Sequence, residues 1–512
     1  MDTTKPVLAA GGRVPLPHDS TFLERQLHTP LFDAVVNYAK EKKVSFHTPG
    51  HKHGDGIAKR FREFVGARIF DIDLTLLEEV DSLHDPQGVI REAQELAAET
   101  YGADATFFLV NGTSVGNHAM ILAACEPGDK ILIPRNAHQS VFAGIILSGA
   151  VPVYVQPVLD RDLHVVANVA TETVAKALDE HPDLKAVLIT SPTYHGITAD
   201  LPAIARLVRS RGKLLLVDEA HGPHFRFHPD LPISAMEAGA DICVQSMHKI
   251  LGAMTQASLL HVKGRSISRS RVRKMLQLLQ TTSPSYILMS SLDVARMQMA
   301  TEGHDQLTRV IQAAEDARAR IRQIPGLSCF GREAAGRSGV QDVDVTKVTV
   351  GTSAIGVFGT EVADVLNHEY GIQIEYADTH GFLAIVSIGN TKHDLDMLVS
   401  ALKLIVQQQG QASLVPHKFY DVPTFSTEVP MTPRDAAFAK SEQVPFGESV
   451  GRICAEIVSP YPPGIPLLVP GERISRETYQ YMSDLAQLGA RINGQDDAKL
   501  KTIKVVHHGV KP

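Results

Sequence analysis

The sequence predicts an α/β protein built on a mostly parallel β-sheet, followed by smaller α+β units. Between residues 90 and 265, short apolar runs alternate with stretches whose apolar residues recur every three or four positions. Gly, Pro, Asp or Ser bounds the runs, which is typical of βαβ units whose strands are buried on both faces. No repeat of fixed period occurs, so the pattern does not favour a solenoid.

The strands of this sheet are expected at six apolar runs. They span 106–110, 130–134, 151–155, 186–190, 213–218 and 241–245. Two of the intervening helices are expected at 114–126 and 201–212, and the second ends at a glycine, which is a common helix stop. Since α/β sheets place functional groups at the carboxyl ends of their strands, residues that follow these runs are the first candidates for a site.

The second half of the chain has a different pattern, that of smaller α+β units. Helices are expected at 304–324, 360–371 and 393–408, and strands at 344–350 and 381–389. A polar, Pro-bearing stretch at 411–434 reads as a linker, and 460–472 is too Pro-rich for regular structure. We therefore predict four segments: an N-terminal arm at 1–60, a large domain at 61–300, a small α+β domain at 301–412 and a C-terminal domain at 413–512.

Composition excludes several classes of protein. Of the 512 residues, 44% are hydrophobic and 21% are charged, so the chain is neither fibrous nor mainly disordered. Lys plus Arg number 50 against 57 Asp plus Glu, a net charge of −7, so a nucleic-acid partner is not expected. No apolar stretch is long enough to span a membrane, and the N-terminus lacks the features of a signal peptide. Because the four cysteines are scattered, we expect free thiols and a cytoplasmic protein.

Lys249 and Asp218 are the pair that points most directly to chemistry. Lys249 follows the strand at 241–245 and precedes small and apolar residues, a setting in which desolvation favours a neutral, nucleophilic amine. Asp218 ends the strand at 213–218, although an Asp at this place also fits a helix N-cap. Together they match a pyridoxal phosphate site, with the Asp on the pyridine nitrogen and the Lys on the aldehyde carbon. The sequence thus predicts pyridoxal 5'-phosphate as the cofactor.

Two further strand ends carry candidate cofactor ligands. The segment 111–117 opens a helix, and its Gly112, Thr113 and Ser114 suit a phosphate through close backbone approach and hydroxyl groups. This segment has neither the Walker pattern nor the dinucleotide fingerprint. His138 also follows a strand, where its ring can stack on a cofactor, although a lone histidine is more commonly a surface or core residue.

These motifs, in their order along the chain, resemble those of one enzyme family. They are FHTPGHKHG from Phe46, NGTS from Asn111, DEAHG from Asp218, SMHK from Ser246 and PYPPGIPLLVPGE from Pro460. The sequence is identified as a member of the Orn/Lys/Arg decarboxylase family of fold-type I pyridoxal phosphate enzymes. The resemblance is to the short, biosynthetic form, without the N-terminal wing of larger members. It implies an aspartate-aminotransferase-like large domain with a mostly parallel sheet, a smaller α+β domain and a C-terminal α+β domain.

The resemblance also implies roles for individual residues. Lys249 holds the cofactor as a Schiff base, Asp218 binds the pyridine nitrogen and His138 stacks on the ring. The other residues implied to bind the cofactor are Gly112, Thr113, Ser114, His221, Ser246 and His248. The proton that replaces the carboxyl group comes from Lys249 or His248, and the sequence does not distinguish these two sources.

The implied reaction is decarboxylation of a basic L-amino acid within polyamine synthesis. Arginine, which would give agmatine and CO2, is the first candidate, with lysine or ornithine as alternatives. Glu456 is the candidate for binding the distal cation, and Cys454 faces the same side if this segment is a strand. A surface Glu and a buried structural thiol are the ordinary alternatives for these two residues. Since sites of this fold usually lie at subunit interfaces, the resemblance implies a homodimer or a higher homo-oligomer.

An aminotransferase on the same fold is the main alternative in reaction type. Such enzymes generally hold the substrate α-carboxylate with an arginine of the small domain, but no arginine occurs between Arg337 and Arg434. Without that clamp, the carboxylate is free to lie in apolar surroundings, where loss of CO2 is favoured. A sulfur-transfer enzyme would need a reactive cysteine on a mobile loop, of which the sequence gives no clear sign.

Two other hypotheses are weaker. A non-catalytic homologue that serves as a binding subunit would have no need of Lys249 together with Asp218. The histidines at 47, 51 and 53 suggest zinc, but a companion ligand at familiar spacing is missing and T-P-G among them indicates a turn. We therefore expect no metal.

Overall fold

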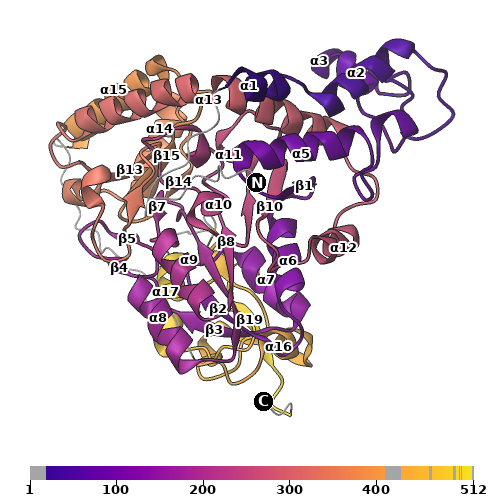
Figure 1. Cartoon of the computed structure of the whole chain (residues 1–512). Coiled ribbons are helices and arrows are strands. Elements are labelled where there is room, and N and C mark those ends of the chain that lie inside the picture. The colour runs from indigo at the N-terminus through magenta and orange to yellow at the C-terminus, as the bar shows by residue number, and fades with distance from the viewer. Residues whose placement is uncertain are drawn as a thin grey trace, which may run out of the picture.

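The computed structural model describes residues 19–409, 428–460, 464–487, 492–494, 496–497 and 499–509. Its largest element is a seven-stranded sheet, seen near the centre of Figure 1, with the strand order β1-β10-β9-β8-β6-β2-β3. The strands are β1 Ala105–Leu109, β10 Ser258–Val262, β9 Ile242–Gln245, β8 Leu214–Asp218, β6 Leu184–Thr190, β2 Lys130–Pro134 and β3 Val151–Val155.

The prediction of a mostly parallel sheet is confirmed. Strands β9, β8, β6, β2 and β3 pair in parallel, and β10 pairs antiparallel with both of its neighbours. The six expected runs all form strands of this sheet, and β10 is the one that the apolar pattern missed. The reason is its composition, because Ser258 and His261 interrupt the run and bond to Thr113 and Thr106 of neighbouring elements.

Successive side chains of the sheet point to opposite layers of helices. Leu216 of β8 packs in a cluster with α6, α7 and α12, whereas Leu215 and Val217 pack in a cluster with α8, α9 and α10. These helices are α6 Gly112–Ala124, α7 Gln139–Ser148, α12 Arg269–Leu279, α8 Thr171–Glu180, α9 Leu201–Ser210 and α10 Ala235–Ala238. Helices therefore cover both faces of the sheet, as its apolar strands predicted.

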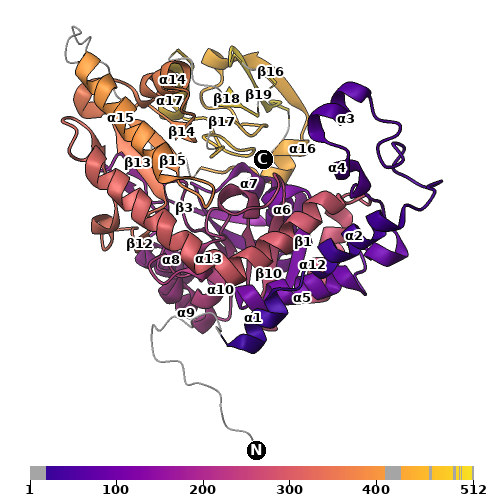
Figure 2. The ribbon, with the colours of Figure 1, turned by 90° about the horizontal axis from the view of Figure 1, so that it is seen from above.

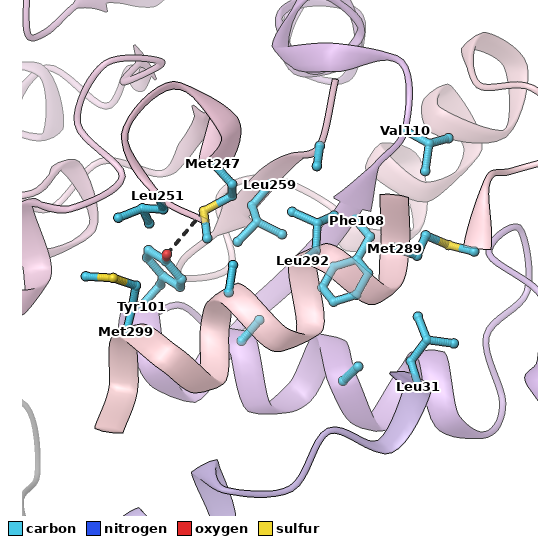
Figure 3. Close-up of a cluster of buried hydrophobic side chains, with 14 of the residues drawn as sticks. Leu31, Tyr101, Phe108, Val110, Met247, Leu251, Leu259, Met289, Leu292 and Met299 are labelled. Carbon is cyan, nitrogen blue, oxygen red and sulfur yellow. Dashed lines mark hydrogen bonds between the residues drawn. The ribbon is translucent and has the colours of Figure 1, made fainter. Parts of the chain in front are cut away.

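A further apolar cluster joins the beginning of the described chain to the long helix α13, Tyr286–Ile321. Figure 3 shows part of it, in which Leu31, Phe108, Leu259, Met289 and Leu292 converge. Its helices are α1 Ser20–Gln26, α2 Pro30–Glu41, α5 Val89–Tyr101, α11 Met247–Ile250 and α13. Figure 2 shows the short helices α3 Lys59–Val65 and α4 Arg68–Asp71 at the margin of the molecule.

A second sheet lies beyond α13 and has the antiparallel order β11-β13-β15-β14. Its strands are β11 Ser328–Cys329, β13 Lys347–Gly351, β15 Gly381–Ile385 and β14 Tyr376–Ala377, and its helices are α14 Gly359–Tyr370 and α15 Lys392–Gln409. Residues of α13, α14 and α15 form one apolar cluster with β13 and β15. The elements expected at 344–350, 360–371, 381–389 and 393–408 are therefore present as helices and strands of the expected kind.

The C-terminal segment has an apolar cluster of its own, which includes Cys454, Leu468 and Ile503. Its helices are α16 Pro433–Phe438 and α17 Arg476–Gln487. Its strands form two antiparallel pairs, β16 Ser441–Pro445 with β19 Thr502–Val506 and β17 Ser459–Pro460 with β18 Ile492–Asn493. Of the linker expected at 411–434, residues 411–427 lie outside the described residues, and its end differs from expectation because Pro433 begins α16. A proline suits the first turn of a helix, where its missing N–H costs nothing.

The remaining pairs are β4 Leu159–Asp160 with β5 Val165–Val166 and β7 Ile197–Thr198 with β12 Asp342–Val343. Short 3-10 turns occur at Glu78–Val80, Phe225–Phe227, Arg332–Ala334, Ser353–Ile355 and Phe446–Glu448. Within the described ranges, every helix is too short or too polar to cross a membrane. The boundaries of the four predicted segments stay predictions.

Candidate active site

The candidate site lies at the carboxyl ends of β8 and β9. Asp218 is the last residue of β8, and Ser246 follows directly after β9 and begins the short helix α11 that carries Lys249. The apolar side chains of α11 fix its position, because Met247 and Ile250 are buried in the cluster of α5 and α13. The Tyr101 hydroxyl also donates to Met247 Sδ at 3.2 Å, as Figure 3 shows. A well-packed helix thus presents Lys249 at the edge of the sheet.

Lys249 contacts a histidine from the neighbouring strand end. Its Nζ lies 2.9 Å from Nε2 of His221, which follows β8. Burial lowers the pKa of Lys249, while the charges of Asp218 and Glu375 act in the opposite direction. Burial also lowers the pKa of His221 well below its usual value, and the nearby charge of Lys249 adds to this effect. The pair therefore favours a neutral imidazole and eases loss of the proton from the amine.

Asp218 is a buried carboxylate with a well-defined partner. Its side chain is 2% exposed, and Asn117 Nδ2 of α6 donates to its Oδ2 at 2.9 Å. The backbone N–H of Ala220 donates to the other oxygen at 3.2 Å. The same Asn117 amide group donates to Ser140 Oγ at 2.9 Å, which connects α6 to α7. These donors fix the orientation of the carboxylate.

His138 begins α7 and is bound to the same network. Its Nδ1 accepts the backbone N–H of Ser140 at 3.2 Å and lies 2.8 Å from Ser140 Oγ. Burial lowers the pKa of His138 to about 4, although the charge of Asp218 opposes this shift. His138 is therefore a neutral imidazole at pH 7, held next to the Asp218 carboxylate network through Ser140.

Three buried hydroxyl groups from different elements meet beside the beginning of α6. Thr113 Oγ1 hydrogen-bonds Ser246 Oγ and lies 2.9 Å from Ser258 Oγ. Gly112 has a φ of +75°, which only glycine adopts without strain, and its N–H donates to the Gln256 carbonyl at 3.1 Å. Clustered hydroxyl groups next to the N-terminus of a long helix form a site that suits a phosphate group.

The other predicted residues lie in different settings. Ser114 is exposed, and His248 is half-buried with its Nδ1 3.1 Å from the Ala257 carbonyl. Glu456 is 9% exposed within the C-terminal segment, where its two oxygens accept the backbone N–H groups of Lys504 and Asp496 at 2.9 and 3.3 Å.

Burial raises the pKa of Glu456, as it does that of the fully buried Cys454, whose Sγ lies 3.1 Å from the Glu456 carbonyl. No contact observed in the described residues brings Glu456 or Cys454 to Lys249. Likewise, no group of three or more His, Cys, Asp or Glu in the described ranges could hold a metal ion.

Sequence reasoning missed three residues of this site. Asn117 and Ser258 are polar residues whose partners come from distant elements, and Tyr194 packs its ring edge-on against His221 with centroids 4.7 Å apart. Of these three, only Asn117 could have been predicted from the sequence. It is a polar residue on a helix that is otherwise buried and apolar, and it stands one turn after the Gly112–Ser114 motif.

Comparison with known proteins agrees with the fold and with the motifs. The family model described as "Orn/Lys/Arg decarboxylase, major domain" matches residues 29–394, and its C-terminal domain matches residues 415–498. The chain belongs to the Orn/Lys/Arg decarboxylase family. The resemblance found in the sequence is thereby confirmed, and with it the expectation of a decarboxylase.

Similar proteins include curated relatives and solved structures. The arginine decarboxylase of Halalkalibacterium halodurans is 44% identical, covering 94% of this chain and 99% of that one, and that of Bacillus subtilis is 43% identical, covering 94% and 98%. The structure of lysine decarboxylase A from Pseudomonas aeruginosa has a TM-score of 0.79 at 25% identity, covering 94% of this chain and 81% of that one. An alanine–glyoxylate aminotransferase from Nostoc sp. has a TM-score of 0.51 at 21% identity, covering 64% and 89%. The predicted fold class is confirmed.

Proposed function

We propose that this chain is a pyridoxal phosphate-dependent arginine decarboxylase, which releases CO2 from arginine and gives agmatine. The observation that carries the proposal is the pairing of Lys249 with His221 next to the buried carboxylate of Asp218. The curated relatives named arginine decarboxylase, which cover nearly the whole chain, support arginine as the substrate.

The residues of the site fit pyridoxal phosphate. The hydroxyl groups of Thr113, Ser246 and Ser258, with the beginning of α6, match the phosphate, and Asp218 matches the protonated pyridine nitrogen. His221 Nδ1 and Asn117 Oδ1 are buried polar atoms without a partner in the described residues, as expected of a site built around a polar ligand. When bound, the cofactor supplies an electron sink for the pair released as the Cα–carboxylate bond breaks.

The residues of this chain prepare the site for that chemistry. Lys249 is the amine that would bind the aldehyde carbon, and His221 at 2.9 Å is placed to hold or accept its proton. Asn117 and the Ala220 N–H orient the Asp218 carboxylate, whose negative charge would hold the proton on the pyridine nitrogen. His138 would contact the ring as a neutral imidazole, which adds no competing charge.

Recognition of the substrate's guanidinium is assigned to Glu456, with Cys454 beside it. The acceptors of Glu456 are engaged by backbone N–H groups within this chain. A guanidinium would therefore share the carboxylate with them, at the substrate's own site or at that of a second subunit. We infer that the enzyme acts as a homodimer in the cytoplasm and supplies agmatine to polyamine synthesis.

A test of the proposed function compares substrates on one preparation. CO2 release from arginine, lysine and ornithine is measured on purified protein loaded with pyridoxal phosphate. We expect turnover of arginine with kcat/KM at least tenfold above the other two. A preference for lysine or ornithine would show that this amino acid, and not arginine, is the substrate. Transfer of the amino group to a keto acid without release of CO2 would overturn the decarboxylase proposal.

A further inference from the structure

Lys347 is a buried lysine whose amine has no partner among the described residues. It is the first residue of β13 in the second sheet, its side chain is 0% exposed and its Nζ makes no hydrogen bond. A buried amine without a partner costs free energy, since it loses hydration and gains nothing in return. Lysines in such positions are therefore rarely kept for stability alone.

The side chain of Lys347 packs against the loop that carries Tyr194 and Gly196, which is connected with the Lys249 site. A Cβ added to Gly196 would come within 2.8 Å of Lys347 Cγ, so the lysine stem passes directly over this glycine. Two residues earlier, the ring of Tyr194 packs on His221, which in turn contacts Lys249. This chain of contacts runs from the stem of Lys347 to the reactive lysine.

A second chain of contacts connects Lys347 with the loop after β8 that carries His221 and His224. Asp344, three residues before Lys347, pairs with His224 Nε2 at 3.1 Å, and His224 follows His221 in the same loop. The other oxygen of Asp344 accepts the Thr346 hydroxyl at 2.7 Å and the Thr346 N–H at 3.0 Å. Thr346 thus engages one oxygen of Asp344, the other faces His224, and neither oxygen forms a hydrogen bond with the amine of Lys347.

The electrostatics agree with a buried cation that has no hydrogen-bonded carboxylate. Burial lowers the pKa of Lys347 to about 8, with the charges of Asp344 and Glu375 opposing the shift and that of Lys249 adding to it. At neutral pH most of the amines still carry a proton. An incoming carboxylate would satisfy the buried donors and stabilise the charge.

We propose that Lys347 binds the α-carboxylate of the amino acid that reacts at Lys249. The inference rests on the proposed function and names a specificity-determining residue for it. Lys347 stands in the domain where aminotransferases of this fold generally carry an arginine, and this chain has none between Arg337 and Arg434. Lys347 thus supplies a cation where the missing arginine led us to expect apolar surroundings alone. A lysine suits a decarboxylase because its charge is conditional: once CO2 has left, the amine can lose its proton, which a guanidinium cannot.

The test uses two ligands that share the guanidinium, of which only one carries the carboxylate. Agmatine has the guanidinium and the amine but no carboxylate, and 5-guanidinopentanoate has the guanidinium and the carboxylate but no amine, so neither is turned over. Their dissociation constants are measured by calorimetry on the holoenzyme and on its Lys347→Met variant. We expect binding of 5-guanidinopentanoate to weaken about 10- to 100-fold, the worth of a charged hydrogen bond, and agmatine binding to change less than about threefold.

A second variant and a separate assay keep the outcomes distinct. Lys347→Arg should retain binding of the carboxylate ligand, whereas a merely structural role would leave both variants impaired toward both ligands. Equal weakening of the two ligands, or no change in either, would overturn the inference. If the holoenzyme releases no CO2 from arginine while only the carboxylate ligand depends on Lys347, the proposed function fails and the inference stands.

Discussion

At the scale of single residues, Asn117 is the group on which the orientation of Asp218 depends. It is 1% exposed and donates to both Asp218 and Ser140. We predict that Asn117→Leu, which has a similar volume and no amide, weakens binding of pyridoxal phosphate about tenfold, because a hydrogen bond to a charged group is lost. Cofactor titration by fluorescence measures this change. Leu122→Met on the same helix is the control, and equal affinities in all three proteins would show that Asn117 does not support the site.

Glu219, next to Asp218, predicts a dependence of stability on pH. Burial raises its pKa to about 8 from the usual 4.5, against hydrogen bonds from Gln245 and the Ala235 N–H. Between these two pH values folded Glu219 holds a proton that the unfolded chain has lost. This group alone therefore lowers the free energy of unfolding by about 1.4 kcal/mol for each pH unit of increase.

The Glu219→Gln variant should lack this contribution. We expect its urea midpoint to fall less than that of the parent protein between pH 6 and pH 8, with the exposed Glu95→Gln as the matched control. If the urea midpoint of Glu219→Gln falls as much as that of the parent protein, another group causes the dependence of stability on pH.

The sequence could identify residues that follow strands, but not those whose meaning comes from a distant partner. Asp218 and Lys249 are predictable because a polar residue after an apolar strand lies at the functional edge of a sheet. Asn117, Ser258 and Lys347 stand within apolar helices or strands, and each contacts a residue that is distant in the sequence: Asp218, Thr113 and Gly196, respectively. A single sequence contains no record of that proximity.

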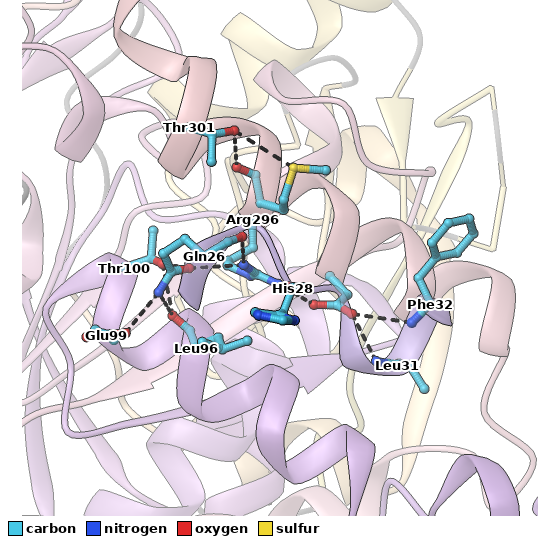
Figure 4. Close-up of polar contacts among 11 residues, drawn as sticks. Gln26, His28, Leu31, Phe32, Leu96, Glu99, Thr100, Arg296 and Thr301 are labelled. Carbon is cyan, nitrogen blue, oxygen red and sulfur yellow. Dashed lines mark hydrogen bonds and ion pairs between the residues drawn. The ribbon is translucent and has the colours of Figure 1, made fainter. Parts of the chain in front are cut away.

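At the scale of elements, α2 depends on α13 for its beginning. Thr29 provides no side-chain cap, and Asp293 Oδ2 of α13 instead accepts the Leu31 N–H at 3.0 Å. Its other oxygen pairs with Arg296 at 2.7 Å, and both side chains of this pair are 0% exposed. Figure 4 shows how Arg296 in turn reaches the carbonyl oxygens of Gln26 and His28.

We predict that Asp293→Ala destabilises the protein by about 3–5 kcal/mol, because it leaves the Arg296 charge buried without its partner. Thermal unfolding followed by circular dichroism measures the effect. Asp305→Ala is the control, since Asp305 lies on the same helix and is 94% exposed. Similar losses in the two variants would indicate that the buried pair is not what holds α2.

Element boundaries were harder to predict than element types. The helix expected at 304–324 is the second half of α13, Tyr286–Ile321. Its first half is buried on several sides, because residues that point in different directions, such as Met289, Ser290 and Ala295, are all buried, so no single apolar face with a period of 3.6 stands out. Burial from all directions removes the pattern on which the prediction depends.

At the scale of the whole molecule, one buried ion pair joins the C-terminal segment to the large sheet. Arg135 follows β2, and its Nε lies 3.1 Å from Glu472 Oε1, with both side chains 0% exposed. The rings of Phe142 and Tyr154 lie 5.3 Å from the guanidinium. The pair stands beside the segment 464–472, which was expected only to be irregular.

We predict that Arg135→Met releases the C-terminal segment from the sheet, because the Glu472 carboxylate is left buried and unpaired. Limited proteolysis should then cut within 428–509 at least tenfold faster. The neighbouring surface pair of Arg473 and Glu428 is the control, since Arg473→Gln removes an exposed ion pair worth at most about 1 kcal/mol. Equal cleavage rates in both variants would contradict the role of the buried pair.

The most direct test of the account asks which lysine holds the cofactor. The holoenzyme is reduced with borohydride, which fixes pyridoxal phosphate on that lysine, and its peptides are sequenced by mass spectrometry. The account predicts a single pyridoxyl group on Lys249 and none in the Lys249→Ala variant. A pyridoxyl group on Lys347 or on any other lysine would contradict it.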